Sequence, residues 1–219
     1  MKIQAIALAV TTSLCAFGSH AAELAGKSYI LGSIGTAKID LKDAEEYYQQ
    51  EADFLNSLPG VSASADIEDS DTSFSFGVGH WFNENVAAEA FYRDYGKVSA
   101  GVNATDGLDS LSEKDEFSAS GLGVGILGFA PLSEAFSLFA RIDLVNLDAE
   151  TKYSYSDTFG NSAGGKEDDT NMKLGLGLGA QYSFNNTIAI RGDFQRIEAE
   201  LEQFEEDIDS FNFSILAMF

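Results

Sequence analysis

The strongest pattern in this sequence is an alternation of apolar and polar residues. In the C-terminal stretch FNFSILAMF, Phe211, Phe213, Ile215, Ala217 and Phe219 fall on every second position. Successive side chains of a strand point to opposite faces, so this period predicts a strand with one apolar face. Seven further stretches repeat the pattern, which gives eight predicted strands at 28–39, 72–82, 85–98, 117–132, 136–147, 171–184, 187–197 and 211–219.

Two features favour a membrane barrel over a soluble β-sandwich, although both contain short alternating strands. The second face of these strands is rich in glycine and serine, which suits the crowded interior of a narrow barrel. The connections alternate between tight turns (83–85, 133–135, 185–186) and long segments (near 42–71, 99–115, 154–170, 202–209). The sequence therefore predicts an all-β fold, an eight-stranded antiparallel transmembrane β-barrel with short periplasmic turns and long extracellular loops.

The first long segment contains two further predictions. Residues 44–58 are expected to form a short helix, although their apolar side chains form no single stripe. Packing over the barrel mouth and contact with another cell or protein are both open interpretations of this helix. Residues 61–68 also leave open a ten-stranded barrel, in which they would belong to an extra hairpin.

Aromatic residues gather near both ends of the predicted strands. Bulky and amphipathic rings are typical of the two membrane interfaces of a barrel. The predicted interface aromatics are Trp81, Phe82, Phe136, Tyr182, Phe184 and Phe219 beside the tight turns and C-terminus, and Tyr92, Tyr95, Phe117, Tyr153 and Phe211 near the long segments.

With these residues in view, the sequence resembles the OmpA-like family of eight-stranded outer-membrane barrels over its whole mature length. The stretch FGVGHWFNENVAAEAFYRDYG (76–96) is similar to the family's second hairpin, and FNFSILAMF is similar to its terminal strand. The resemblance implies a filled barrel interior and a terminal strand that is read by the barrel-assembly machinery. It covers the transmembrane domain only, so the peptidoglycan-binding domain of full-length OmpA is not expected.

The N-terminal segment predicts export. Residues 1–22 combine Lys2, an apolar run and small residues, which is the plan of a signal peptide cleaved after Ala21 or Ala22. The alternative, a membrane anchor, is disfavoured because the apolar run is short. The barrel domain would then be 23–219, without a disulfide because Cys15, the single cysteine, lies in the signal peptide.

The acidic charge of the chain limits the classes of partner that it can bind. The formal net charge of −22 excludes nucleic acid, since phosphate contacts need lysine and arginine. Acidic residues concentrate in two long segments, near 43–71 and 198–207. Two interpretations stay open: a solvated, repulsive surface, or carboxylates that bind divalent cations and share them with lipopolysaccharide phosphates. Outer-membrane lipid and lipopolysaccharide are expected partners of the barrel itself.

Several charged residues lie at predicted inward positions, where opposite charges are expected to pair. They form the predicted lumen network of Glu89, Arg93, Arg141, Asp143, Lys173, Arg191 and Asp193. One interpretation is a salt-bridged plug that fixes strand register, which leaves a structural and surface-interaction role for the protein. The alternative is a narrow channel for ions or small solutes, whose selectivity these charges would set.

Catalysis finds little support in the sequence. After export the mature chain would hold one histidine, His80, near a tight turn, with neither a serine motif nor a second histidine to form a hydrolase or zinc site. The G-x-G repeats alternate with leucine and are followed by no helix pattern, so they predict a strand face and not a nucleotide site. We therefore expect no enzyme activity, no cofactor and no specific metal site.

Overall fold

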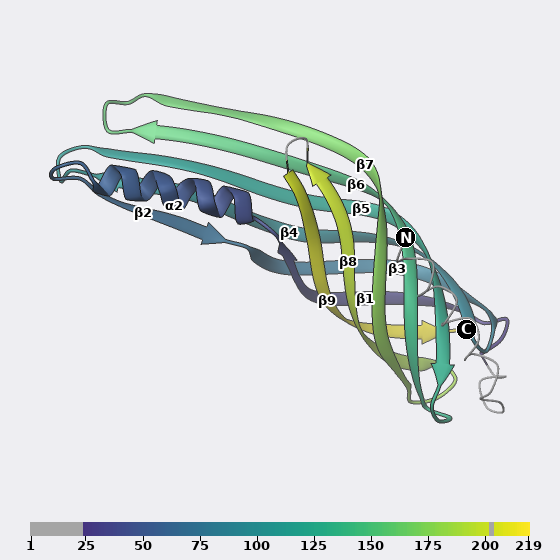
Figure 1. The fold of residues 1–219 in the computed structure, drawn as a ribbon. Coiled ribbons are helices and arrows are strands. Elements are labelled where there is room, and N and C mark those ends of the chain that lie inside the picture. The colour runs from purple at the N-terminus through teal and green to yellow at the C-terminus, as the bar shows by residue number, and fades with distance from the viewer. Residues whose placement is uncertain (1–23, 202–203) are drawn as a thin grey trace, which may run out of the picture.

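The chain forms one closed β-barrel from which a long, flat extension projects (Figure 1). The structure is a computed structural model that describes residues 24–201 and 204–219. The predicted signal peptide, 1–22, lies outside the described residues. The elements are β1 (Ser28–Ile39), α2 (Lys42–Asn56), β2 (Ser62–Glu68), β3 (Ser70–Asn83), β4 (Val86–Thr105), β5 (Ser110–Pro131), β6 (Phe136–Asp157), β7 (Ser162–Ser183), β8 (Ile188–Leu201) and β9 (Phe204–Met218).

Eight strands form the ring of the barrel, which confirms the predicted fold class. Neighbours pair antiparallel in the order β1, β3, β4, β5, β6, β7, β8 and β9. The ring closes where β9 returns to β1, from Tyr29 opposite Met218 to Ile39 opposite Ile208. The alternating C-terminal stretch is therefore the closing strand, and closure satisfies backbone groups that would otherwise form an exposed edge.

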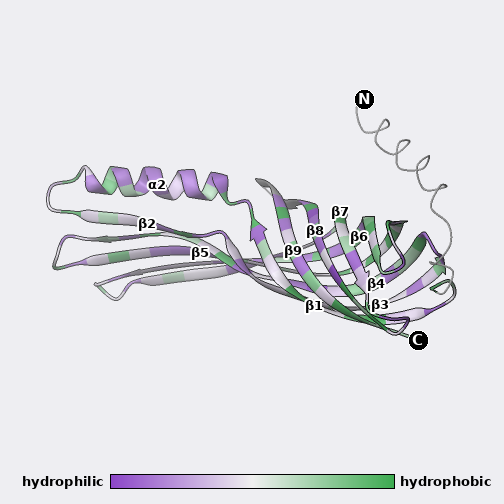
Figure 2. Ribbon diagram, turned by 90° about the horizontal axis from the view of Figure 1, so that it is seen from below, coloured by the Kyte–Doolittle hydropathy of each residue, from purple (hydrophilic) through white to green (hydrophobic). Residues whose placement is uncertain are grey.

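The outer wall of the barrel is apolar, as the alternation predicts. Figure 2 shows hydrophobic residues recurring along the barrel strands. Hydrocarbon tolerates such a surface, whereas water penalises it. Exposed apolar side chains on this wall include Ile34, Phe76, Val124, Ile142, Leu176 and Ile215. No helix among the described residues is long and apolar enough to cross a membrane.

Asparagine side chains shape two of the tight turns at one end of the barrel. The Asn83 carboxamide oxygen accepts a hydrogen bond from the Asn85 backbone N–H (2.8 Å) between β3 and β4. Between β7 and β8, the Asn185 carboxamide oxygen accepts hydrogen bonds from the backbone N–H groups of Thr187 (2.8 Å) and Ile188 (2.9 Å). Such side-chain contacts reverse the chain locally, and the turns occur where the sequence predicts them.

At the opposite end, three of the four predicted long loops are wrong, because 99–115 and 154–170 are largely strand and β9 already begins at Phe204, within 202–209. Strands β4 to β7 run for 20 to 22 residues, well beyond the barrel. We call this extension, with β2 and α2, the platform; it comprises residues 42–68, 98–119 and 148–170. A β-bulge between Asp94 and Lys97, with Gly96 at φ +78°, marks where β4 leaves the barrel.

Residues 61–68 do not join the ring, so the ten-stranded alternative is wrong. Strand β2 is a ninth strand of the described chain, where it pairs with β4 alone, from Ser62 opposite Thr105 to Glu68 opposite Ser99. The predicted helix is present as α2, which lies along the platform beside β2 (Figure 2). Tyr48 and Ala52 on α2 are buried in the same apolar cluster as Ala100 and Val102 of β4. The helix therefore packs on the inner face of the platform.

Candidate functional site: the barrel interior and the platform

The inner faces of the barrel strands carry a buried layer of charge. Three carboxylates and three guanidinium groups project inward, on strands β4, β6 and β8. Because an uncompensated charge in a medium of low dielectric constant costs several kcal/mol, this balance of signs matters for stability. The six almost fully buried residues are Glu89, Arg93, Arg141, Asp143, Arg191 and Asp193.

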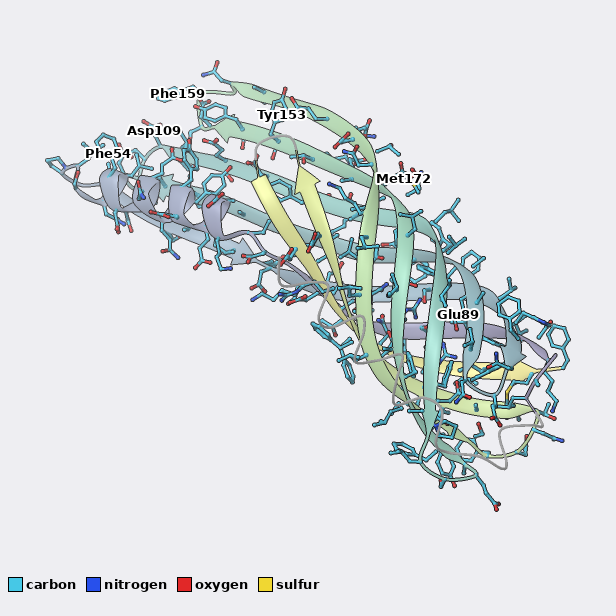
Figure 3. All side chains as sticks on the ribbon, turned by 45° about the vertical axis from the view of Figure 1, so that its right-hand side comes forward. Phe54, Glu89, Asp109, Tyr153, Phe159 and Met172 are labelled. Carbon is cyan, nitrogen blue, oxygen red and sulfur yellow. The ribbon has the colours of Figure 1, made fainter. Side chains whose placement is uncertain are left out.

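Glu89 joins four strands across the interior; Figure 3 labels it within the barrel. Its Oε1 atom accepts hydrogen bonds from Arg191 Nη1 and from the Tyr29 hydroxyl, the latter at 2.7 Å. Its Oε2 atom lies 3.5 Å from Arg141 Nη2. Strands β1, β4, β6 and β8 are thereby connected through one carboxylate.

A second carboxylate, Asp143, anchors the rest of the layer. Arg141 donates to it twice, from Nε to Oδ2 (2.7 Å) and from Nη2 to Oδ1 (2.9 Å). This bidentate geometry fixes both side chains, since charge-assisted pairs are the stronger hydrogen bonds. The Gln195 amide donates to Asp143 Oδ2, and its Oε1 accepts from Arg93 Nη1. Five of the six charged residues, all except Asp193, are thus joined in one network.

Apolar side chains enclose this charged layer on both sides. Along β6 the inward residues run from Phe139 through Arg141 and Asp143 to Val145 and Leu147. Phe139 belongs to an apolar cluster on the tight-turn side, which also holds Tyr29, Trp81, Leu127, Phe129 and Met218. Val145 and Leu147 belong to a cluster on the platform side, which also holds Tyr95, Phe117, Ile197 and Ile208.

The seventh predicted lumen charge lies apart from these six. Lys173 shares the inner face of β7 but sits nearer the platform, opposite Val145, and is half-buried. Sequence reasoning also missed the neutral members of the network. Gln181 Oε1 accepts from Arg191 Nη2 (3.0 Å), and Asn212 Nδ2 donates to Asp193 Oδ2 (3.2 Å). Both residues alternate with apolar positions and lie on the glycine- and serine-rich face, which could have indicated that they point into the barrel.

Three predicted interface aromatics, Trp81, Tyr95 and Phe117, are wrong, because they are buried in the interior apolar clusters. Trp81 is 1% exposed and Tyr95 is 0% exposed. The Trp81 ring centroid lies 4.2 Å from that of Phe129, in the cluster on the tight-turn side. Phe117 is likewise buried, and Tyr153 lies on the platform. The remaining residues are exposed or half-buried at the outer wall or strand ends: Phe82, Tyr92, Phe136, Tyr182, Phe184, Phe211 and Phe219.

The inner face of the platform holds carboxylates beside α2. Asp115 on β5 accepts a hydrogen bond from the Tyr48 hydroxyl, and Glu113 lies two residues away. Burial raises the pKa of both carboxyl groups, and the neighbouring Glu51 raises the pKa of Glu113 further. The Glu51 Oε2 atom is itself buried without a hydrogen-bond partner. Helix α2 therefore packs against carboxylates whose ionised form is destabilised by burial and by their neighbours.

Docking of α2 is expected to tighten as the pH falls. A carboxyl group whose pKa is raised by docking binds protons more tightly in the docked state. Protonation therefore stabilises docking, and this stabilisation is complete below the unfolded pKa of about 4 and is lost as the pH rises. Glu113→Gln removes this penalty near Glu51. We expect amide hydrogen exchange in α2 to slow by about 1.4- to 5-fold at about pH 7, measured by mass spectrometry. Glu116→Gln, on the opposite face of β5, is the control; equal slowing in both variants would contradict this account.

Other predicted chemistry has a simple structural setting. His80 Nδ1 lies 3.1 Å from the Ser28 hydroxyl, and the His80 ring packs edge-on against Phe82 near a tight turn. Within the described part of the chain, no group of three or more His, Cys, Asp or Glu side chains is arranged to hold a metal ion. Residues 202 and 203 of the second acidic segment lie outside the described residues.

Comparison with known proteins gives one family and a group of similar folds. The model of the outer membrane protein β-barrel domain family matches residues 6–219. Similar solved structures include Ail, the attachment invasion locus protein of Yersinia pestis (14% identity, TM-score 0.46, 89% of this chain and 99% of that chain). Neisserial surface protein A (10%, 0.47, 89% and 99%) and OprG from Pseudomonas aeruginosa (14%, 0.45, 92% and 99%) are also similar. No curated protein sequence matches this chain.

Proposed function

This chain belongs to the outer membrane protein β-barrel family, and we propose that it is a closed, non-conducting barrel with a structural and surface-interaction role. It resides in the bacterial outer membrane, as its family implies. In this proposal residues 1–22 are the export signal, and the tight turns face the periplasm. The platform with its acidic residues then stands outside the cell, where it is available to partners.

One observation carries the closed barrel. Glu89 and Asp143 pair with Arg191 and Arg141 in the charged layer, while Arg93 and Asp193 bond to the neutral side chains of Gln195 and Asn212. The layer lies between two apolar clusters, so inward side chains occupy the lumen at three successive levels. An ion that crossed it would have to displace the Arg141–Asp143 pair and pass apolar side chains without its hydration shell. Both steps are costly in a medium of low dielectric constant.

The expected partners remain part of the proposal. The exposed apolar wall suits membrane lipid, with lipopolysaccharide in the outer leaflet. The closing strand β9, together with Phe219, is the segment that the assembly machinery would read. Divalent cations at acidic segments would be shared with lipid phosphates and would not occupy a protein-only site. The proposal assigns no catalytic activity to the protein.

Single-channel recording tests the closed barrel. Purified, refolded protein is added to a planar bilayer, and folding is checked by its gel mobility before and after heating. We expect no reproducible current steps from folded protein, with an open porin as the positive control. Reproducible steps with ion selectivity would overturn the proposal in favour of the rival function, a narrow channel whose filter is the charged layer.

A further inference from the structure

The inner face of the platform contains a floor of tyrosines and carboxylates next to α2. Strand pairing places Glu113 opposite Tyr155 and Asp115 opposite Tyr153. The next strand contributes Glu167, opposite Thr151, on the same face. We call the surface formed by Glu113, Asp115, Tyr153, Tyr155 and Glu167 the floor.

The two faces of these strands differ in charge. Lys114, Lys152 and Lys166 occupy alternate positions, on the outer face, and all three are exposed. On that face lysines and carboxylates pair, as in Lys166 with Glu150 (2.7 Å) and with Asp168 (3.0 Å). Among the described residues no basic side chain acts on Glu113 or Asp115, and the Tyr48 hydroxyl is the hydrogen-bond donor to Asp115. The floor therefore holds negative charge that the protein itself leaves uncompensated.

Tyr153 and Glu167 of the floor are exposed, whereas Glu113 and Asp115 are half-buried beside α2. Helix α2 packs on β2 and β4 and leaves the inner face of β6 and β7 uncovered, and Figure 3 shows Tyr153 on the projecting β6–β7 hairpin. Tyr153 is 49% exposed, and its ring lies beside Gly165 on β7, which has no side chain to cover it. Strand β7 pairs with β8 only from Gly175 to Ser183, so its outer segment has no described strand on that side. A ligand can approach the floor from this open edge.

We propose that the floor binds a cationic, extended peptide segment of a partner protein. Guanidinium and ammonium groups would pair with the carboxylates of Glu113 and Glu167 and would rest on the faces of Tyr153 and Tyr155. This inference rests on the proposed function only in placing the platform outside the cell.

The spacing of the floor specifies the form of the partner. Tyr153 and Tyr155 are two residues apart on β6, and so are Glu113 and Asp115 on β5. Residues two apart in a strand are roughly 7 Å apart and face the same way. An extended peptide with lysine or arginine at every second position repeats this distance. A helix would present its basic side chains with a different period.

Peptide binding to the whole protein in lipid nanodiscs tests the inference. The probe is a fluorescein-labelled peptide of alternating arginine and serine, and its anisotropy is followed at low and moderate salt. The double substitution Tyr153→Thr with Tyr155→Thr is expected to weaken binding about 5- to 30-fold, because two cation–π contacts are lost. Glu113→Gln with Glu167→Gln is expected to weaken it about tenfold at low salt and less as salt screens the charges.

A control double substitution on the outer face distinguishes binding at the floor from nonspecific attraction to the acidic protein. Glu116→Gln with Asp168→Asn removes the same charge from the same two strands, and we expect binding within about twofold of the unsubstituted protein. Equal weakening by both acidic pairs, or no weakening by the tyrosine pair, would overturn the proposal. So would displacement of the peptide by calcium at equimolar concentration, which would assign the carboxylates to a metal. Binding is independent of current, so a conducting protein that still binds the peptide refutes only the closed barrel.

Discussion

Replacing Arg141 with methionine is expected to lower the free energy of unfolding by about 3–5 kcal/mol, because the change leaves buried carboxylates without their partner. Asp143 would lose a bidentate pair, and Glu89 would lose one of its two guanidinium neighbours. Methionine retains most of the packing volume, so the effect reports charge and not a cavity. Denaturant unfolding in lipid vesicles, followed by gel mobility, measures the loss.

Two further variants isolate the cause of this loss. Lys152→Met removes an exposed ion pair with Glu150 on the same strand and is expected to cost less than about 1 kcal/mol. Adding Asp143→Leu to Arg141→Met is expected to restore part of the stability, since removing both charges is often nearly neutral. A single Arg141→Met change that costs as little as Lys152→Met would contradict the buried network. In a channel, the main effect of Arg141→Met would be altered selectivity.

The sequence predicted the barrel because apolar alternation is strong wherever one strand face meets lipid. The prediction failed where neither strand face contacts lipid. In the outer half of β6, residues 150–157 are polar or aromatic on both faces, so no apolar period distinguishes strand from loop. These residues form strand because pairing with β5 and β7 continues along the whole hairpin. The neighbours supply the hydrogen bonds, and no local pattern reports them.

In the barrel interior, alternation predicted which face of the strand a side chain occupies. It did not predict the position of that side chain along the barrel axis or its interaction partner. Glu89 and Arg191 are 102 residues apart in sequence, and only ring closure with its register brings them together. The misplaced aromatics Trp81 and Tyr95 are a different case. Trp81 alternates with the lipid-facing Phe82, and Tyr95 follows Arg93 by two positions, so parity alone places both inward. Their aromatic character favoured the membrane interface, but their alternation with neighbouring residues predicted the inward face, which is where both side chains lie.

Substitution of Gly125 by valine is expected to destabilise the barrel by about 1–3 kcal/mol through overpacking, in addition to what the displaced network loses. Gly125 lies on β5 directly between Glu89 on β4 and Asp143 on β6. A Cβ atom at this position would lie 1.9 Å from Asp143 Oδ1, so the carboxylate has to move. Because Asp143 also holds Arg141 and Gln195, the displacement reaches two further side chains.

Gly128 on the same strand provides the matched control. A Cβ atom there meets no atom within 4 Å, and valine favours strand conformation, so Gly128→Val is expected to change stability by less than about 0.5 kcal/mol. Combining Gly125→Val with Asp143→Ser tests the mechanism, because serine removes the atoms that the valine meets. We expect the two changes to couple by about 0.5–3 kcal/mol. Strict additivity would show instead that valine disturbs the strand itself, and the charged layer would then not be what confines β5 to glycine at this position.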